Sequence, residues 1–269
     1  MRVVVASEPA RAGEVNEDFF AAVPAGAVLL DGAGTRGAEA ICRHGVAWYT
    51  YRLGGEIVAR LGLDDVALTT LLAEAIAAVA DAHRATCDLT DPSSPSSTVA
   101  IYRTGGDYLV LGDSVLVLDL PPGPVVVHDR REVDFRVPYQ AAYEAAPHGT
   151  AEWEEARRVY IAALRANRNQ PGGFWLAKDD PRAAAEAIIG TAPVEDLNGV
   201  ALLSNGASRY VDRFATADWP ETLATLSTHG PRDIIRRVRA SEQAAGVEPD
   251  DATAAYLTDE SWPPRPNPA

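Results

Sequence analysis

Residues 98–127 of this 269-residue chain read TVAIYRTGGDYLVLGDSVLVLDLPPGPVVV. Four short apolar runs are separated by Gly, Pro, Asp and Ser, which are the residues that favour turns. Runs of this length and composition, joined by short turn segments, predict consecutive antiparallel strands. We place these strands at residues 98–102, 108–111, 115–118 and 125–127.

The rest of the chain collects its predicted strands and helices into groups. Apolar runs predict further strands at residues 3–5, 27–30, 200–203 and 253–257. Helical spacing of apolar residues covers 37–61, 66–85, 139–168, 181–189, 219–228 and 231–245. Grouped strands and helices favour an α+β fold over an alternating parallel α/β fold. We therefore expect an antiparallel sandwich with helices on the outside.

Composition limits the possible partners and the compartment. The chain has 24 Lys and Arg against 38 Asp and Glu, a formal charge of −14, which would repel a nucleic acid or an anionic membrane surface. No apolar stretch reaches membrane-spanning length, and the N-terminal run is too short for a signal peptide. The chain is interpreted as a cytoplasmic monomer that binds neither nucleic acid nor membrane.

Cysteine and histidine carry no predicted chemistry. Cys42 and Cys87 are too few for a disulfide framework and have no Cys-x-x-Cys spacing for zinc, which is typical of a reducing cytosol. The histidines show no ligand spacing and are His44, His83, His128, His148 and His229.

Acidic segments stand beside the predicted strands at four places. They are Asn-Glu-Asp at 16–18, Asp-Gly at 31–32, Gly-Asp-Ser at 112–114 and Asp-Asp-Ala-Thr at 250–253. Strand ends are rigid, so their carboxylates can converge, and converging carboxylates require a cation. Oxygen ligands without His or Cys favour Mg²⁺ or Mn²⁺ over zinc. Any one of these segments alone could instead be a turn or a helix cap.

With Ser-Ser-Thr at 96–98 and Ser-Asn-Gly at 204–206, these motifs follow the order found in the metal-dependent type-2C Ser/Thr protein phosphatases, the PPM family. The chain resembles that family over nearly its whole length. Residues 169–175 with Asp180-Pro181, and residues 208–212, further resemble an actinobacterial branch. The resemblance implies a four-layer α-β-β-α sandwich with two Mg²⁺ or Mn²⁺ ions, and a possible third, at one end of the sheets.

The resemblance also implies roles for individual residues. Asp31 would bridge the two ions, the Gly32 carbonyl and Asp250 would be further ligands, and Asp113 would serve the third ion. Glu17 and Asp18 would hold metal-bound waters. The implied reaction is hydrolysis of phosphoserine or phosphothreonine in proteins by a metal-bridging hydroxide.

Three positions depart from the family pattern. Asn205 stands where the family has Asp, and Asp251 is a candidate ligand that would partly restore the charge. Gly13 stands where the family has a phosphate-binding Arg, so Arg11 and Arg36 become the candidates for substrate binding. Ala33 replaces the His that eukaryotic members carry after Asp-Gly.

These departures leave three hypotheses open. The first is an active protein phosphatase, the second a degenerate phosphatase-like domain that binds a phosphoprotein or partner without efficient turnover, and the third a hydrolase of a small phosphorylated metabolite. We expect one domain at residues 1–259 with a helical flap insertion at about 139–178, and a Pro-rich flexible tail at 260–269. The flap lies where the family varies, which makes it the candidate for substrate choice.

Overall fold

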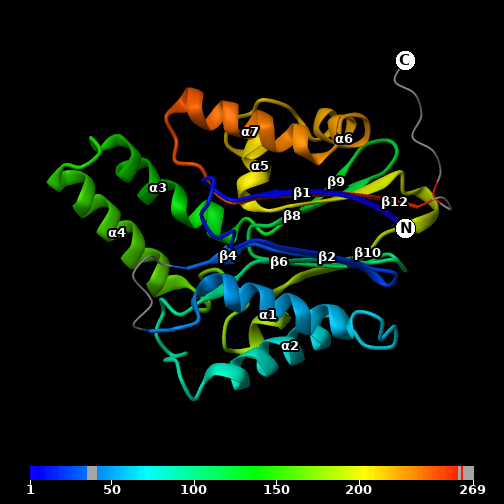
Figure 1. Ribbon diagram of the computed structural model, residues 1–269, viewed down its shortest axis with the longest axis horizontal. Coiled ribbons are helices and arrows are strands. Elements are labelled where there is room, and N and C mark those ends of the chain that lie inside the picture. Colours follow the sequence, from blue (N-terminus) through cyan, green and yellow to red (C-terminus); the bar gives the residue numbers. More distant parts are fainter. Residues whose placement is uncertain (35–40, 260–261, 263–269) are drawn as a thin grey trace.

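The computed structural model describes residues 1–34, 41–259 and 262. Two five-stranded antiparallel sheets are stacked face to face (Figure 1). The first sheet has the order β1 (Arg2–Glu8), β12 (Ala252–Thr258), β11 (Gly199–Leu203), β8 (Val115–Asp119) and β9 (Val125–His128). The second has the order β10 (Ile188–Thr191), β7 (Asp107–Leu111), β6 (Val99–Arg103), β3 (Gly26–Leu30) and β2 (Phe19–Val23). A short ribbon pairs β4 (Gly32–Ala33) with β5 (Ser96–Ser97).

Helices cover the outer face of each sheet, so the predicted α+β sandwich with four layers is confirmed (Figure 1). The second sheet is covered by α1 (Gly45–Arg60) and α2 (Leu68–His83). The first sheet is covered by α5 (Asn205–Asp212), α6 (Trp219–Thr228) and α7 (Pro231–Ala245). The helices α3 (Arg131–Ala145) and α4 (Ala151–Asn167) pack on each other beyond one end of the sheets. Short 3-10 turns lie at Pro181–Glu186 and Val194–Asp196.

The apolar runs of the central strands are continuous because both of their faces are covered. In β3, Val28 and Leu30 face α1 and α2, whereas Ala27 and Leu29 face the first sheet, and all four are fully buried. Successive side chains of a strand point to opposite faces, so an uninterrupted apolar run supplies both layers of core. The rigid strand that leads into Asp31 is fixed in this way.

Several segments differ from the sequence-based assignment. The predicted helix at 181–189 is a 3-10 turn followed by strand β10, in which the β-branched Ile188 and Ile189 pair with β7. Helix α3 begins at Arg131, eight residues before the predicted start at 139, and it continues through Pro138. Strand β2 and helix α5 were not predicted.

Two predictions reach residues beyond the described ranges. Helix α1 begins at Gly45, and the first four residues of the predicted helix at 37–61 lie outside the described ranges. In the predicted tail, Trp262 packs edge-on against Tyr102 with ring centroids 6.1 Å apart, and residues 260, 261 and 263–269 lie outside the description. No described helix is long and apolar enough to cross a membrane.

Candidate metal centre

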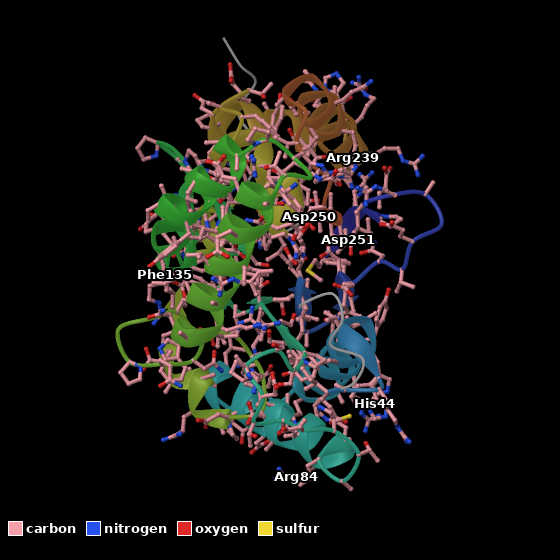
Figure 2. The ribbon with its side chains drawn as sticks, turned by 90° about the vertical axis from the view of Figure 1, so that its left-hand side faces the viewer. His44, Arg84, Phe135, Arg239, Asp250 and Asp251 are labelled. Carbon is pink, nitrogen blue, oxygen red and sulfur yellow. The ribbon has the colours of Figure 1, made fainter. Side chains whose placement is uncertain are left out.

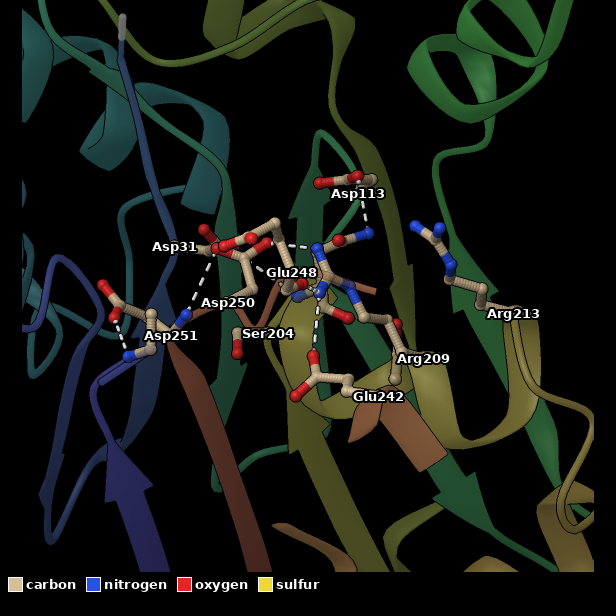
Figure 3. A network of polar contacts seen from close by, with 12 residues as sticks. Asp31, Asp113, Ser204, Arg209, Arg213, Glu242, Glu248, Asp250 and Asp251 are labelled. Carbon is tan, nitrogen blue, oxygen red and sulfur yellow. Dashed lines mark hydrogen bonds and ion pairs between the residues drawn. The ribbon is translucent and has the colours of Figure 1, made fainter. Parts of the chain in front are cut away.

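Loops from both sheets meet at the end of the sandwich that faces α3. Strand β3 leads into Asp31, the turn between β7 and β8 carries Asp113, and Asp250 precedes β12. Figure 3 shows these three side chains in one polar network, and Figure 2 shows Asp250 and Asp251 between the two outer helical layers. Together with Asp18, which precedes β2, they form the acidic cluster: Asp18, Asp31, Asp113 and Asp250.

Asp31 lies at the electrostatic centre of the acidic cluster. Burial raises the pKa of its carboxyl well above the ordinary value, and the negative charges of the other three members raise it further. The backbone N–H of Asn205 donates a hydrogen bond to Asp31 Oδ2 over 2.8 Å, which opposes part of that rise. Among the described residues, no Lys, Arg or His forms an ion pair with Asp31.

Asp18 is buried without adequate partners. Only 3% of the residue is exposed, and neither carboxylate oxygen has a well-aligned hydrogen bond within the described part of the chain. Burial raises the pKa of Asp18 to about 7, although the nearby hydroxyls of Thr253 and Ser204 act in the opposite direction. A buried carboxylate in this state is unfavourable unless it is protonated or meets a cation.

Asp113 and Asn205 are directly linked. The side-chain amide of Asn205 donates from Nδ2 to Asp113 Oδ2 over 2.9 Å, and Arg136 of α3 pairs with the same oxygen over 3.3 Å. The amide nitrogen of Asn205 therefore faces Asp113, and its Oδ1 is left as the atom that could reach a cation.

Asp250 and Asp251 have different surroundings although they are adjacent. Asp250 pairs with Arg209 of α5 over 2.6 Å, and Arg209 is held from behind by the buried Glu242 over 2.8 Å (Figure 3). Asp251 accepts backbone N–H groups through both oxygens, from Ala10 over 2.7 Å and from Glu17 over 2.6 Å. Asp251 thus fixes the loop that carries Glu17 and Asp18 rather than facing the acidic cluster.

Two glycines of the motifs are required by close backbone packing. A Cβ at Gly206 would lie 1.9 Å from the Asp251 carbonyl oxygen, and one at Gly32 would lie 2.7 Å from that of Glu17. Neither neighbour can move away cheaply because both are backbone atoms. The Asp-Gly and Asn-Gly pairs of the sequence are therefore explained by packing between loops, which also positions the flanking polar residues.

The structure does not place either candidate substrate-binding residue, Arg11 or Arg36, beside the acidic cluster. Arg11 is ion-paired with Glu248, and also with Glu14 over 3.5 Å. Arg36 lies outside the described residues. Gly13 has a φ of +87°, a conformation in which a side chain is strained, so an arginine at this position would not be accommodated without a backbone change.

Sequence reasoning missed the arginines that surround the acidic cluster. Arg136 and Arg209 reach Asp113 and Asp250 from helices α3 and α5, and neither helix start was predicted. Glu132, one turn before Arg136, is half-buried, and desolvation together with the negative charge of Asp113 raises its pKa to about 7. A polar, helix-spaced pattern from residue 131 onward is the signal that could have found α3.

The donor set fits a hard divalent cation. The acidic cluster offers carboxylate oxygens, with the Gly32 carbonyl and Asn205 Oδ1 as further oxygen donors, and Asp18 and Asp31 lack a compensating positive charge among the described residues. No three described His, Cys, Asp or Glu ligand atoms at this end lie within 4.8 Å of one another. The carboxylate oxygens are therefore spaced more widely than the ligands of a single ion would be.

Comparison with solved structures identifies the fold. The chain is similar to the PPM Ser/Thr phosphatase of Mycobacterium smegmatis solved with cacodylate (19% identity, 95% of this chain and 97% of that chain, TM-score 0.56). It is also similar to the catalytic domain of the phosphatase PstP solved with two manganese ions (17% identity, 95% and 96% coverage, TM-score 0.56). The Staphylococcus aureus Ser/Thr phosphatase matches at 12% identity with 96% and 94% coverage and a TM-score of 0.56.

At these identities the similarity shows the fold, which is the PPM sandwich fold. No protein-family model and no curated protein sequence matches the chain.

Proposed function

We propose that the protein is a Mg²⁺- or Mn²⁺-dependent phosphatase that hydrolyses phosphoserine and phosphothreonine in proteins. The observation that carries the proposal is the pair of uncompensated carboxylates, the buried Asp18 and the half-buried Asp31, at the sheet end of a PPM fold. Bound divalent ions would supply the positive charge that these groups lack, together with a water that ionises near neutral pH.

The residues divide into those that would hold cations and those that orient them. Asp31, Asp250, the Gly32 carbonyl and Asn205 Oδ1 would be direct ligands, and Asp113 would serve a further ion. Glu17 and Asp18 would accept hydrogen bonds from waters at the centre. The Asn205 N–H fixes the orientation of Asp31, and Asp251 fixes the backbone N–H of Glu17.

A degenerate phosphatase-like domain is the second candidate, and it rests on the arginines. Arg136 and Arg209 neutralise Asp113 and Asp250, and Asn205 supplies an amide in place of a carboxylate. A centre balanced in this way by side-chain cations would hold metal weakly and could bind a phosphoprotein without turning it over.

Hydrolysis assays on a metal series separate the candidates. We expect the metal-free chain to be inactive and Mn²⁺ or Mg²⁺ to restore hydrolysis of an aryl phosphate and of phosphoserine or phosphothreonine peptides, with a higher kcat/KM for the peptides. Metal-induced stabilisation without turnover would instead favour the degenerate domain. A preference for small phosphorylated metabolites over the peptides would favour the third hypothesis and contradict a protein substrate.

The flap offers a cationic pocket for the peptide. A cavity of about 270 Å³ lies between Gly34, three residues after Asp31, and the flap helices. Its other lining residues are Tyr143, Arg157, Tyr160, Ile161, Leu164, Arg165 and Arg168. No carboxylate of the described residues lines this cavity, and within the same part of the chain the buried Nε atoms of Arg165 and Arg168 have no hydrogen-bond partner. An acidic segment beside the phosphorylated residue could pair with the arginine side chains that line the cavity.

We therefore expect Arg165→Gln to raise KM for an acidic phosphopeptide about tenfold, the effect of one charge-assisted hydrogen bond. The kcat for an aryl phosphate should stay unchanged because that substrate does not reach the flap. Arg158→Gln is the matched control, since Arg158 lies on the same helix, is exposed and pairs with Glu155. Equal KM values for the two variants would exclude this cavity from substrate binding.

A further inference from the structure

A second cluster of ligand-type side chains lies away from the acidic cluster. Cys42 and His44 precede α1, Cys87 follows α2, and one ligand atom from each lies within 4.8 Å of the other two. Among the described residues, no other three His, Cys, Asp or Glu side chains meet this closely. Figure 2 shows His44 in the helical layer formed by α1 and α2, far from Asp250.

The distances within this cluster match those of a metal site. His44 Nδ1 lies 3.3 Å from Cys87 Sγ and 3.9 Å from Cys42 Sγ. In a tetrahedral zinc site, with zinc at about 2.3 Å from sulfur and about 2.0 Å from nitrogen, the ligand sulfur and nitrogen are about 3.6 Å apart. The two observed distances lie on either side of that value.

The surroundings hold the three side chains in place. The His44 ring is stacked on Trp48 with centroids 4.3 Å apart, which fixes the ring plane. The N–H of Asp88 donates to the carbonyl of Ile41 over 3.0 Å, which ties the segment with Cys87 to the one with Cys42. Because the ligands are already assembled, binding would require little reorganisation.

We propose that Cys42, His44 and Cys87 form a binding site for Zn²⁺ or a metal of the same class, with a fourth position open to water or another ligand. Two thiolates and an imidazole are soft to borderline donors, which select zinc over Mg²⁺ or Mn²⁺. Each thiol releases its proton to solvent on binding. The site is thus chemically distinct from the oxygen donors of the acidic cluster.

A bound metal would also stabilise the segment Gly32–Gly34, which directly follows Asp31. Val46, two residues after His44, packs closely on β4 and on Gly34, which follows it: a Cβ at Gly34 would lie 2.1 Å from Val46 Cγ2, and one at Gly32 would lie 2.7 Å from Val46 Cγ1. Fixing the start of α1 therefore restrains the segment that directly follows Asp31. The proposal does not depend on the activity of the acidic cluster, because its test measures metal binding and stability.

The test uses the full chain, reduced and freed of metal by a chelator, with Co²⁺ and Zn²⁺ as probes. We expect one equivalent of Co²⁺ to produce near-ultraviolet thiolate charge-transfer absorption that Zn²⁺ abolishes, and Zn²⁺ to raise the Tm. Cys42→Ser and Cys87→Ser should each weaken Zn²⁺ binding by about 100-fold or more and remove the charge-transfer band. Asp31→Asn and the exposed His229→Gln are controls that should keep both.

Two results would overturn the proposal. One is unchanged Zn²⁺ affinity in both cysteine variants, which would assign the metal to another part of the chain. The other is a reduced chain that takes up no Zn²⁺ and, on mild oxidation, joins Cys42 to Cys87 in a disulfide, which would make the pair a redox element. Trp fluorescence, to which the stacked Trp48 contributes, shows whether each variant keeps the local fold.

Discussion

Asp31→Ala is expected to abolish metal-dependent hydrolysis, with a fall in kcat/KM on the order of a thousand-fold or more, while the chain stays folded. The Asp31 carboxylate interacts electrostatically with Asp18, Asp250 and Asp113. Its loss would therefore remove the ligand shared by any ions bound there. The Tm of the metal-free chain should not fall, because the variant also removes a half-buried carboxyl whose ionised form is repelled by its neighbours. The hydrogen bond from Asn205 N–H is lost in exchange, at about 1 kcal/mol.

Calorimetric titration with Mn²⁺ and thermal unfolding, each with and without metal, check this prediction. Asp107→Asn is the matched control, because Asp107 begins β7 at the opposite end of the sheet from Asp113 and its side chain is half exposed. A folded Asp31→Ala variant that binds Mn²⁺ as tightly as the parent chain would exclude Asp31 as a ligand. A variant that fails to fold would show that Asp31 stabilises the structure in the absence of metal.

The fold was predictable because its central strands are apolar on both faces. Uninterrupted apolar runs, such as those at 27–30 and 115–118, predict strands that are buried on both faces. The acidic motifs at their ends have a fixed position relative to these strands. Edge elements were harder to identify. Strand β10 is largely exposed and follows a Pro-initiated turn, so its sequence has the character of a short helix.

The partners of the acidic residues were not predictable from local sequence. Asp250 and Asp251 are adjacent and chemically identical, yet one pairs with Arg209 and the other accepts backbone N–H groups from the loop at residues 10–17. The Cys and His cluster gave no signal either. Its ligands are 45 residues apart at the extremes, and only the packing of α1 against α2 brings Cys87 to His44.

Asn205→Asp is expected to change stability in opposite directions with and without metal. Without metal, the variant replaces the Nδ2 donor of Asp113 with a carboxylate and adds a charge beside Asp31, whose pKa is already raised. Loss of a hydrogen bond to a charged group costs about 1.5–3 kcal/mol, which lowers the Tm by several degrees in a chain of this size. With Mn²⁺, the new carboxylate at position 205 acts as a ligand. The affinity for Mn²⁺ should therefore rise about tenfold or more, and turnover should rise with it.

The prediction is tested by thermal unfolding and by aryl phosphate hydrolysis, both measured across one Mn²⁺ series for the parent chain and the variant. Asn198→Asp is the control, because it makes the same chemical change just before the start of β11, at the opposite end from Asn205. Higher affinity with higher turnover would mean that the amide at 205 limits an otherwise competent centre. Higher affinity without turnover would favour the degenerate domain, since metal would then be bound and still unused. Equal stability and equal metal dependence in the two chains would show that position 205 contacts no metal, and the degenerate hypothesis would then rest on Arg136 and Arg209 alone.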